Sequence, residues 1–319
     1  MATAATTPAA LPAKRRVQVG DEIARLITIV FATSILLITI LLVFELWGSA
    51  AVARQKFGFA FLWTSNWDPV QNDFGALPFL YGTVVTSVLA LIISVPLGIG
   101  AAIYLSELAP ANISSGLTFL VELLAAVPSV IYGLLAIFTL VPLMRSYGAP
   151  FLRATLGFIP LFQGPSYGVG YITAGVILSV MTVPYIISVS REALLAVPRE
   201  QREAALALGS TRWESTWKVV VPYARLGIMG SIFLALARAL GETMAVTMVI
   251  GNDPTIHASL LAPGYTIAAV IANEFTEATG KIYPAALVEL GLVLFLLTII
   301  INGLARLLIV ATTGKGSAR

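Results

Sequence analysis

One polar stretch of the chain reads Glu203-Ala204-Ala205-Leu206-Ala207-Leu208-Gly209 and is followed after nine residues by Val219-Val220-Val221-Pro222. It belongs to a charged segment, and a long apolar run lies on either side of it, at about 168–190 and 226–250. Alanine and leucine are strong helix formers, and glycine commonly follows the last residue of a helix. The sequence therefore predicts a polar helical segment placed between two membrane spans.

The composition of the whole chain favours a membrane protein. Of its 319 residues 58% are hydrophobic and 11% are charged, whereas a soluble domain usually carries about 25% charged residues. The absence of cysteine and the presence of a single histidine, His257, exclude disulfides, thiolate metal sites, cysteine nucleophiles and a histidine metal cluster. We therefore predict no metal site and no catalytic residue in this chain, and we interpret His257 as a solvated loop residue.

Six apolar runs are long enough to cross a membrane as helices, because a bilayer core of about 30 Å needs about 20 residues. The first follows Lys14-Arg15-Arg16 as a signal peptide would, but it is longer than the about 7–15 residues of a signal core. We therefore predict that it is a retained span. The predicted spans are about 23–47, 80–106, 116–143, 168–190, 226–250 and 285–310. The predicted fold class is an all-α integral membrane protein with six transmembrane helices.

Basic residues predict the orientation, because cytoplasmic loops carry an excess of lysine and arginine. Six of them lie between Arg191 and Arg225, and six spans place the basic residues of both tails on that same side. Both termini are therefore predicted to be cytoplasmic, although the short loop near 107–115 on that side carries no lysine or arginine. The predicted organisation is a disordered tail, one six-span domain that contains the loop 191–222, and a C-terminal cytoplasmic tail, at residues 1–20, 21–310 and 311–319.

The polar segment 198–217 is predicted to form a helix, a turn and a second helix. Pro198 suits the first position of a helix, and Gly209 suits the left-handed residue after a helix end. Thr211 and Glu214 match a capping box that opens the second helix. Small alanines on a short helix would allow a partner's groove to approach closely. An amphipathic helix lying at the lipid interface is the alternative interpretation.

Two charged residues lie inside the predicted fifth span. Arg238 is at its midpoint and Glu242 follows one helical turn later, so the two are expected to form a pair. An arginine at the bilayer centre costs about 2.5–3.5 kcal/mol, so the pair is either a self-compensated structural feature or an element that faces a pathway for an anion. Glu122 in the third span is a further candidate that water could reach. Solvated or capping roles are expected for Glu45, Glu107 and Glu289, which fall in end turns.

The polar segment resembles the coupling loop of permease subunits in ABC importers. That signature consists of Glu-Ala-Ala, three residues, Gly, nine residues and aliphatic-x-aliphatic-Pro. It is matched here by Glu203, Ala204, Ala205, Gly209, Val219, Val221 and Pro222. The resemblance implies a type I ABC importer permease fold, in which the segment 198–217 docks into a cytoplasmic ATP-binding subunit.

This chain is expected to bind no cofactor itself. It has no phosphate-binding P-loop motif, because the tail residues Gly314-Lys315-Gly316-Ser317 have the wrong order and spacing. ATP and Mg²⁺ are therefore expected in the partner subunit, and the chain is expected to be a non-catalytic membrane subunit of an ATP-hydrolysing transporter.

Further runs narrow the resemblance to the permeases of phosphate ABC importers. The run from Arg238 to Val246 resembles them, and so do the runs at 75–78, 81–83, 95–98 and 126–133. The length, the tail and the outer loop from Phe57 to Pro78 resemble the PstC-type subunit more than its PstA-type partner.

This resemblance implies both a substrate and a set of partners. In that family the fifth-span arginine and glutamate are implicated in phosphate transport, so Arg238 and Glu242 are expected to line the substrate pathway. The implied partners are a dimer of ATP-binding subunits, a PstA-type permease and an external phosphate-binding protein. The implied location is the inner membrane of a bacterium.

Three alternatives stay open from the residues. A permease for sulfate, molybdate or phosphonate would keep the polar segment and change the cargo. An ion-coupled carrier or channel acting alone would leave that segment unexplained. A scaffold without transport activity would produce no flux defect when it is removed.

Overall fold

The computed structural model describes residues 19–313, and its internal contacts divide the chain into two units, 1–48 and 49–319. The first unit consists, as far as it is described, of residues 19–48 of the helix α1 (Val19–Ser49). This helix begins within the predicted tail 1–20, whose residues 1–18 lie outside the described part of the chain. The predicted C-terminal tail likewise lies outside it from residue 314 onward.

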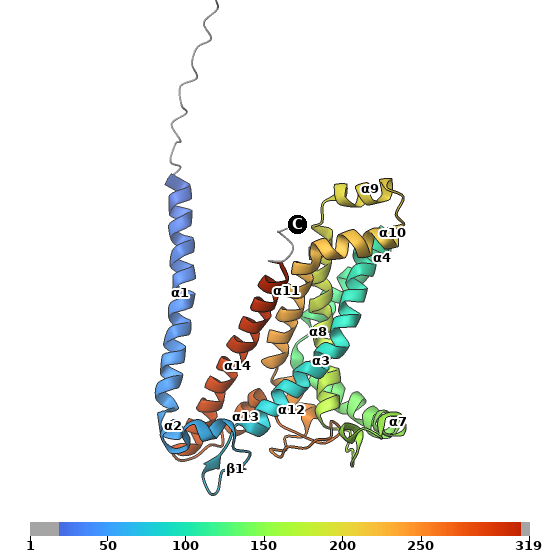
Figure 1. The fold of residues 1–319 in the computed structure, drawn as a ribbon. Coiled ribbons are helices and arrows are strands. Elements are labelled where there is room, and N and C mark those ends of the chain that lie inside the picture. The colour runs from blue at the N-terminus through green and yellow to red at the C-terminus, as the bar shows by residue number, and fades with distance from the viewer. Residues whose placement is uncertain (1–18, 314–319) are drawn as a thin grey trace, which may run out of the picture. The chain divides into compact units, whose positions relative to one another are not determined.

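The second unit is built of helices and one short hairpin (Figure 1). Its first half contains α2 (Ala51–Phe57), η1 (Gly58–Leu62), β1 (Trp67–Asp68), β2 (Asp73–Phe74), α3 (Leu77–Ile103), η2 (Tyr104–Leu108), α4 (Ala111–Ala126), α5 (Ser129–Leu135), η3 (Ala136–Leu140) and α6 (Val141–Leu143). Its second half contains η4 (Met144–Gly148), α7 (Ala149–Leu156), η5 (Pro160–Phe162), α8 (Tyr171–Leu195), α9 (Arg199–Ala207), α10 (Arg212–Ser215), η6 (Thr216–Val220), α11 (Val221–Leu240), α12 (Met244–Ile250), α13 (Ile267–Glu274) and α14 (Ile282–Thr313). The π-helical turns η2, η3, η4 and η6 continue their neighbouring helices without a gap.

Six helical stretches among the described residues are long and apolar enough to cross a membrane, which confirms the predicted fold class. They are Glu22–Ser49, Leu77–Leu108, Ser129–Leu156, Tyr171–Leu195, Arg212–Leu240 and Ile282–Leu307. The chain is therefore an all-α protein whose apolar length matches six crossings of a bilayer.

The third predicted span, 116–143, was wrong as one continuous helix. The structure breaks it at Val127, whose backbone is extended with ψ 128°, and Pro128 then opens α5. A proline disfavours the helical conformation of the residue before it, which explains the break. The short apolar helix α4 therefore precedes the break, and the helical stretch from Ser129 to Leu156 follows it.

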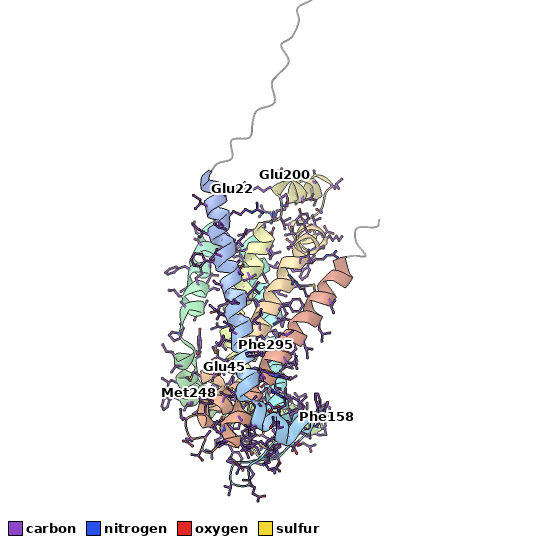
Figure 2. All side chains as sticks on the ribbon, turned by 90° about the vertical axis from the view of Figure 1, so that its left-hand side faces the viewer. Glu22, Glu45, Phe158, Glu200, Met248 and Phe295 are labelled. Carbon is purple, nitrogen blue, oxygen red and sulfur yellow. The ribbon has the colours of Figure 1, made fainter. Side chains whose placement is uncertain are left out.

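The second unit has two distinct ends (Figure 1). The β1–β2 hairpin, α7 and α13 lie at one end, and α9 and α10 lie at the other. In Figure 2 the side chain of Glu200 projects from α9, the outermost helix of its end, whereas Met248 lies in the opposite half of the unit. We call the end with α9 the coupling end and the end with the hairpin the hairpin end.

The hairpin end is a packed lobe, and it includes the predicted outer loop from Phe57 to Pro78. A buried aromatic cluster joins the segment 53–79 to the segment 265–290, and Trp67 packs edge-on against Phe79 with ring centroids 4.7 Å apart. Trp67 Nε1 and the Tyr283 hydroxyl both donate to one carboxylate oxygen of Glu274, at 2.8 and 2.6 Å. These aromatics therefore fill a hydrophobic core.

The helix α8 is the centre of the unit and packs against both α3 and α11. Glycines allow the close approach: a Cβ on Gly98 of α3 would lie 2.6 Å from Ile186 of α8, and one on Gly175 would lie 2.7 Å from Leu89. Small residues at crossings are typical of membrane helices, because they let the backbones come together where no hydrophobic effect drives association.

Candidate functional site

The fifth predicted span, 226–250, is interrupted at the charged residues. The helix α11 ends at Leu240, and α12 begins only at Met244. Arg238 therefore lies in the last turn of α11, not at the midpoint of a continuous helix. A cation is favoured there, because the last carbonyls of a helix carry the negative end of its dipole.

The expected pair between Arg238 and Glu242 is not formed, and that expectation was wrong. No ion pair joins the two side chains in the part of the chain that the structure describes. The break at Gly241 removes the helical spacing that would bring them together. Glu242 Oε1 instead accepts a hydrogen bond of 3.4 Å from the backbone N–H of Ala245, in the first turn of α12.

Arg238 is held by an aromatic ring. Its guanidinium carbon lies 4.3 Å from the ring centroid of Tyr185 on α8, a cation–π geometry. Its Nε atom is buried and has no hydrogen-bond partner among the described residues. A half-buried guanidinium with an unused donor is therefore positioned at the break of the fifth span.

Two tyrosines donate hydrogen bonds to the end of α4, just before the break between α4 and α5. The Tyr185 hydroxyl donates to the carbonyl of Ala125 at 3.1 Å, and the Tyr132 hydroxyl donates to that of Leu124 at 2.7 Å. The last carbonyls of a helix have no partner inside it. The Tyr185 hydroxyl supplies one for Ala125, and Leu124 accepts both from the Tyr132 hydroxyl and from the backbone N–H of Val127 at 3.3 Å. Tyr185 thus contacts both Arg238 and the end of α4.

The helices that follow the two breaks, α5 and α12, lie side by side. The helix α5 packs on α12, and a Cβ on Gly133 would lie 3.2 Å from the Cα of Ala245. The runs 126–133 and 238–246, which carried the resemblance, are therefore brought together at one place in the fold. Glu122 lies exposed on α4, whereas Glu289, expected in a solvated turn, is buried in α14.

The polar segment 198–217 has the predicted helix–turn–helix form with one correction. Gly209 follows the end of α9 with φ +87°, and Thr211 and Glu214 form the predicted capping box at the start of α10. Pro198 is the residue that precedes the first helical position, not that position itself. Glu203, Ala204 and Pro222 are exposed and Ala205 is half-buried.

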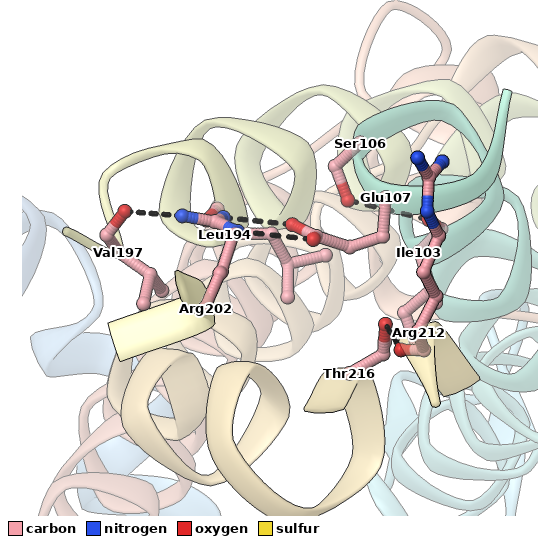
Figure 3. Close-up of polar contacts among 8 residues, drawn as sticks. All are labelled: Ile103, Ser106, Glu107, Leu194, Val197, Arg202, Arg212 and Thr216. Atoms are coloured by element: carbon pink, nitrogen blue, oxygen red, sulfur yellow. Dashed lines mark hydrogen bonds and ion pairs between the residues drawn. The ribbon is translucent and has the colours of Figure 1, made fainter. Parts of the chain in front are cut away.

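An interaction that the sequence did not predict holds α9 in place. Arg202 Nε and Nη2 donate to the two carboxylate oxygens of Glu107 at 3.0 and 2.7 Å (Figure 3). The pKa of Arg202 is raised, first because of this hydrogen bond, so the residue stays charged. The available signal was the absence of lysine and arginine from residues 107–115, which leaves Glu107 without a local partner.

Comparisons with known proteins agree with this fold. The family described as binding-protein-dependent transport system inner membrane component matches residues 94–312. The phosphate transport system permease protein PstC of Xylella fastidiosa is 47% identical over 274 residues, which are 85% of this chain and 84% of the relative. The protein of the same name from Mesorhizobium japonicum is 44% identical over 308 residues, which are 95% of this chain and 94% of the relative.

One solved structure shows the same fold at low sequence identity. The crystal structure of a bacterial ABC transporter involved in the import of the acidic polysaccharide alginate matches with a TM-score of 0.58 at 16% identity. The match covers 91% of this chain and 98% of the other. The type I ABC importer permease fold expected from the polar segment 198–217 is thus confirmed.

The fold and the match define a multi-pass permease of the inner membrane. The chain belongs to the family of binding-protein-dependent transport system inner membrane components. Its similarity to the PstC-type permeases of that family, expected from the runs around Arg238 and Tyr132, is also confirmed.

Proposed function

We propose that this chain is the PstC-type permease subunit of an ATP-driven importer of inorganic phosphate and forms half of its translocation pathway. The relatives that are 44–47% identical carry the name of a phosphate transport system permease. The observation that carries the proposal is Arg238, placed at the break of the fifth crossing with an unused buried donor.

The chemistry of Arg238 suits passage of an oxyanion. A guanidinium can bind two phosphate oxygens at once, and discontinuous helices commonly build the substrate sites of transporters. The ring of Tyr185 lies 4.3 Å from the guanidinium carbon, and the Nε–H has no hydrogen-bond partner among the described residues. Transit requires release as well as capture, and a single cation gives a weaker site than a closed cage of donors.

Glu242 keeps its place at the substrate pathway in this proposal, but not as the ion-pair partner of Arg238. Since it forms no pair with Arg238 within residues 19–313, its negative charge is not cancelled locally. It precedes α12, and its carboxylate accepts a hydrogen bond from Ala245 in the first turn of that helix, where an anion is favoured by the helix dipole. We assign it two tasks: fixing the break, and lowering the affinity of Arg238 for phosphate through repulsion of the anion.

The coupling end docks the energy source. The exposed face of α9 with Glu203 and Ala204, together with Ala205, Gly209 and Pro222, receives a dimer of ATP-binding subunits, which hold ATP and Mg²⁺. The basic loop 191–225 and both termini are cytoplasmic, and this chain performs no catalysis. A PstA-type permease completes the pathway, and an external phosphate-binding protein delivers the substrate to the hairpin end.

Uptake of labelled phosphate tests the proposal. Phosphate-starved cells that lack this chain and the low-affinity phosphate carriers would receive wild type, Arg238→Gln or Glu203→Arg. We expect wild type to restore ATP-dependent uptake. Arg238→Gln should assemble and fail to transport, and Glu203→Arg should lose the ATP-binding subunit on co-purification.

Competing anions define the cargo in the same cells. Unlabelled phosphate should compete for uptake, and sulfate, molybdate and phosphonate should not. If uptake of sulfate or molybdate depends on the chain and that of phosphate does not, the cargo assignment is wrong. Uptake that follows an ion gradient and survives deletion of 198–217 would contradict the permease assignment itself.

A further inference from the structure

The helix α9 has very little apolar packing on its own chain. None of its nine residues is buried, and only Arg202 and Ala205 are half-buried. A helix of nine residues is too short to be stable by itself in water. Its position relative to the membrane crossings therefore depends on specific contacts, and not on a hydrophobic core.

Arg202 supplies those contacts. Besides its two bonds to Glu107, its Nη2 donates to the carbonyl of Leu194 at 2.7 Å and its Nη1 donates to the carbonyl of Val197 (Figure 3). One side chain thus joins three pieces of structure: the end of the α3 crossing, the end of α8 and the loop before α9. A lysine could not reproduce this pattern, because its single nitrogen lacks the planar fork.

The residues that accept hydrogen bonds from Arg202 belong to the packed part of the coupling end. Leu194 and Val197 are buried in the hydrophobic cluster of the coupling end, which also contains Ala102 and Ile103 of α3. Glu107 lies in η2, which continues α3 without a gap. The arginine therefore connects the exposed docking helix to a packed core that holds α3, α8 and α11 together.

The gap beside this contact is not filled by other side chains. A cavity of about 410 Å³ lies there, lined by Ser106, Glu107, Leu195, Arg199, Arg202 and Glu203.

Surface ion pairs are usually worth little. This one is bidentate, and its side chains are only 20% and 10% exposed, so it is a structural link and not a solvated pair.

We propose that Arg202 and Glu107 form a coupling clamp, which passes the movement of α9 to the α3 crossing and to α8. This inference rests on the proposed function, because it assumes that an ATP-driven subunit moves α9. Arg202 and Glu107 are positioning residues: they touch neither ATP nor phosphate. Without the clamp α9 still docks and ATP is still hydrolysed, but the α3 crossing and α8 no longer move with α9.

The test uses the complete transporter in lipid vesicles, with phosphate transported per ATP hydrolysed as the measured ratio. We expect Arg202→Lys and Glu107→Gln each to lower the ratio at least about fivefold, the lower end of typical coupling between sites. The double variant should fall no further than either single variant, because both changes break the same link. Hydrolysis and subunit assembly should persist.

Arg191→Lys is the matched control. It changes an arginine to a lysine at the same end of the unit. The acidic partner of Arg191, its sequence neighbour Glu192, is 73% exposed and joins no second element. The ratio should stay at the wild-type value. An unchanged ratio in Arg202→Lys, additive effects in the double variant, or a loss of assembled complex at an unchanged ratio would each overturn the clamp.

A distance measurement separates failure of the clamp from failure of the proposed function. The chain has no cysteine, so spin labels on Gln201→Cys and Leu108→Cys report the distance between α9 and the end of the α3 crossing. With the clamp intact the distance should be the same with and without bound nucleotide, whatever the cargo is. In Arg202→Lys the distribution of distances between the two labels should become broader. A distance that already changes with nucleotide while the clamp is intact would also refute the proposal.

Discussion

At the scale of single residues, the ring of Tyr185 has a testable effect on Arg238. Tyr185→Leu removes the face on which the guanidinium lies 4.3 Å from the ring centroid. A cation–π contact is worth about 0.5–2 kcal/mol, so phosphate uptake per assembled transporter should fall by about 2- to 30-fold. Uptake of labelled phosphate, normalised to the amount of membrane protein, measures the loss.

Tyr185→Phe is the control for this change. It keeps the ring and removes the hydroxyl that donates to Ala125. We expect uptake per transporter close to wild type, with a lower yield of folded protein because the end of α4 loses a hydrogen bond. Equal loss of uptake in the Phe and Leu variants would show that the hydroxyl, and not the ring, positions Arg238.

The sequence identified which charged residues to examine, but not how they are paired. Arg238 and Glu242 stood out because charges in an apolar run are rare, and both lie at the break. Their pairing followed from an assumed continuous helix, and the end of α11 at Leu240 removed it. The partner of Glu107 lies 95 positions away on α9, and local spacing carries no information on such a contact.

At the scale of elements, two glycines of α3 provide matched substitutions. A Cβ added at Gly98 would lie only 2.6 Å from the side chain of Ile186 on α8. A Cβ added at Gly100 would have no heavy atom within 4 Å among the described residues. Gly98→Ala should destabilise the unit by about 1–3 kcal/mol through overpacking. Gly100→Ala should stabilise it by up to about 1 kcal/mol through helix propensity.

Thermal unfolding of the purified transporter in detergent measures both changes. Since the two substitutions add the same methyl group to the same helix, the difference between them isolates the contact with α8. If both variants shift the unfolding midpoint alike, the close approach of α3 and α8 at Gly98 does not exist in the protein.

The turn after α9 allows a second comparison within an element. Gly209 has φ +87° and free space around it, so Gly209→Ala meets only backbone strain, about 1–2 kcal/mol for a left-handed residue. Asparagine adopts that conformation more readily. Co-purification of the ATP-binding subunit should therefore weaken more in Gly209→Ala than in Gly209→Asn. Equal weakening would mean that the left-handed turn is not needed for docking.

Elements with strong local signals were predicted well, and those set by distant contacts were not. The capping box at Thr211 and the left-handed Gly209 depend on neighbouring residues, so the sequence predicted both. Pro128 gave a local signal for the break before α5, but helix-breaking residues are tolerated in membrane spans and the break was missed. The packing of the outer loop from Phe57 to Pro78 was not predicted, because its core joins segments about 200 positions apart, such as Trp67 with Glu274.

At the scale of the whole molecule, α8 connects the two candidate sites. It carries the carbonyl of Leu194, which Arg202 grips, and the ring of Tyr185, which holds Arg238. Nine residues separate these positions, which corresponds to roughly 14 Å along a helix. A movement of α9 that reaches the end of α8 therefore reaches Arg238 through one continuous helix, whereas α11 and α4 end at breaks in the chain.

The two ends of the second unit are expected to differ in their accessibility to a thiol reagent added from outside the cell. Val70 is 91% exposed at the hairpin end, and Asn112 is exposed in the first turn of α4 at the coupling end. The native chain has no cysteine, so Val70→Cys and Asn112→Cys each introduce one unique thiol. Asn112 also lies on the loop 107–115, the one predicted cytoplasmic loop without a lysine or arginine.

A membrane-impermeant maleimide, added to intact cells whose outer membrane has been opened, distinguishes the two sides. We expect Val70→Cys to be labelled at once and Asn112→Cys only after the inner membrane is permeabilised, because the basic residues of the loop 191–225 predict that the coupling end is cytoplasmic. The reverse order would invert the orientation. It would also move the docking of an ATP-binding subunit to a side without ATP, so the coupling function assigned to α9 would have to be abandoned.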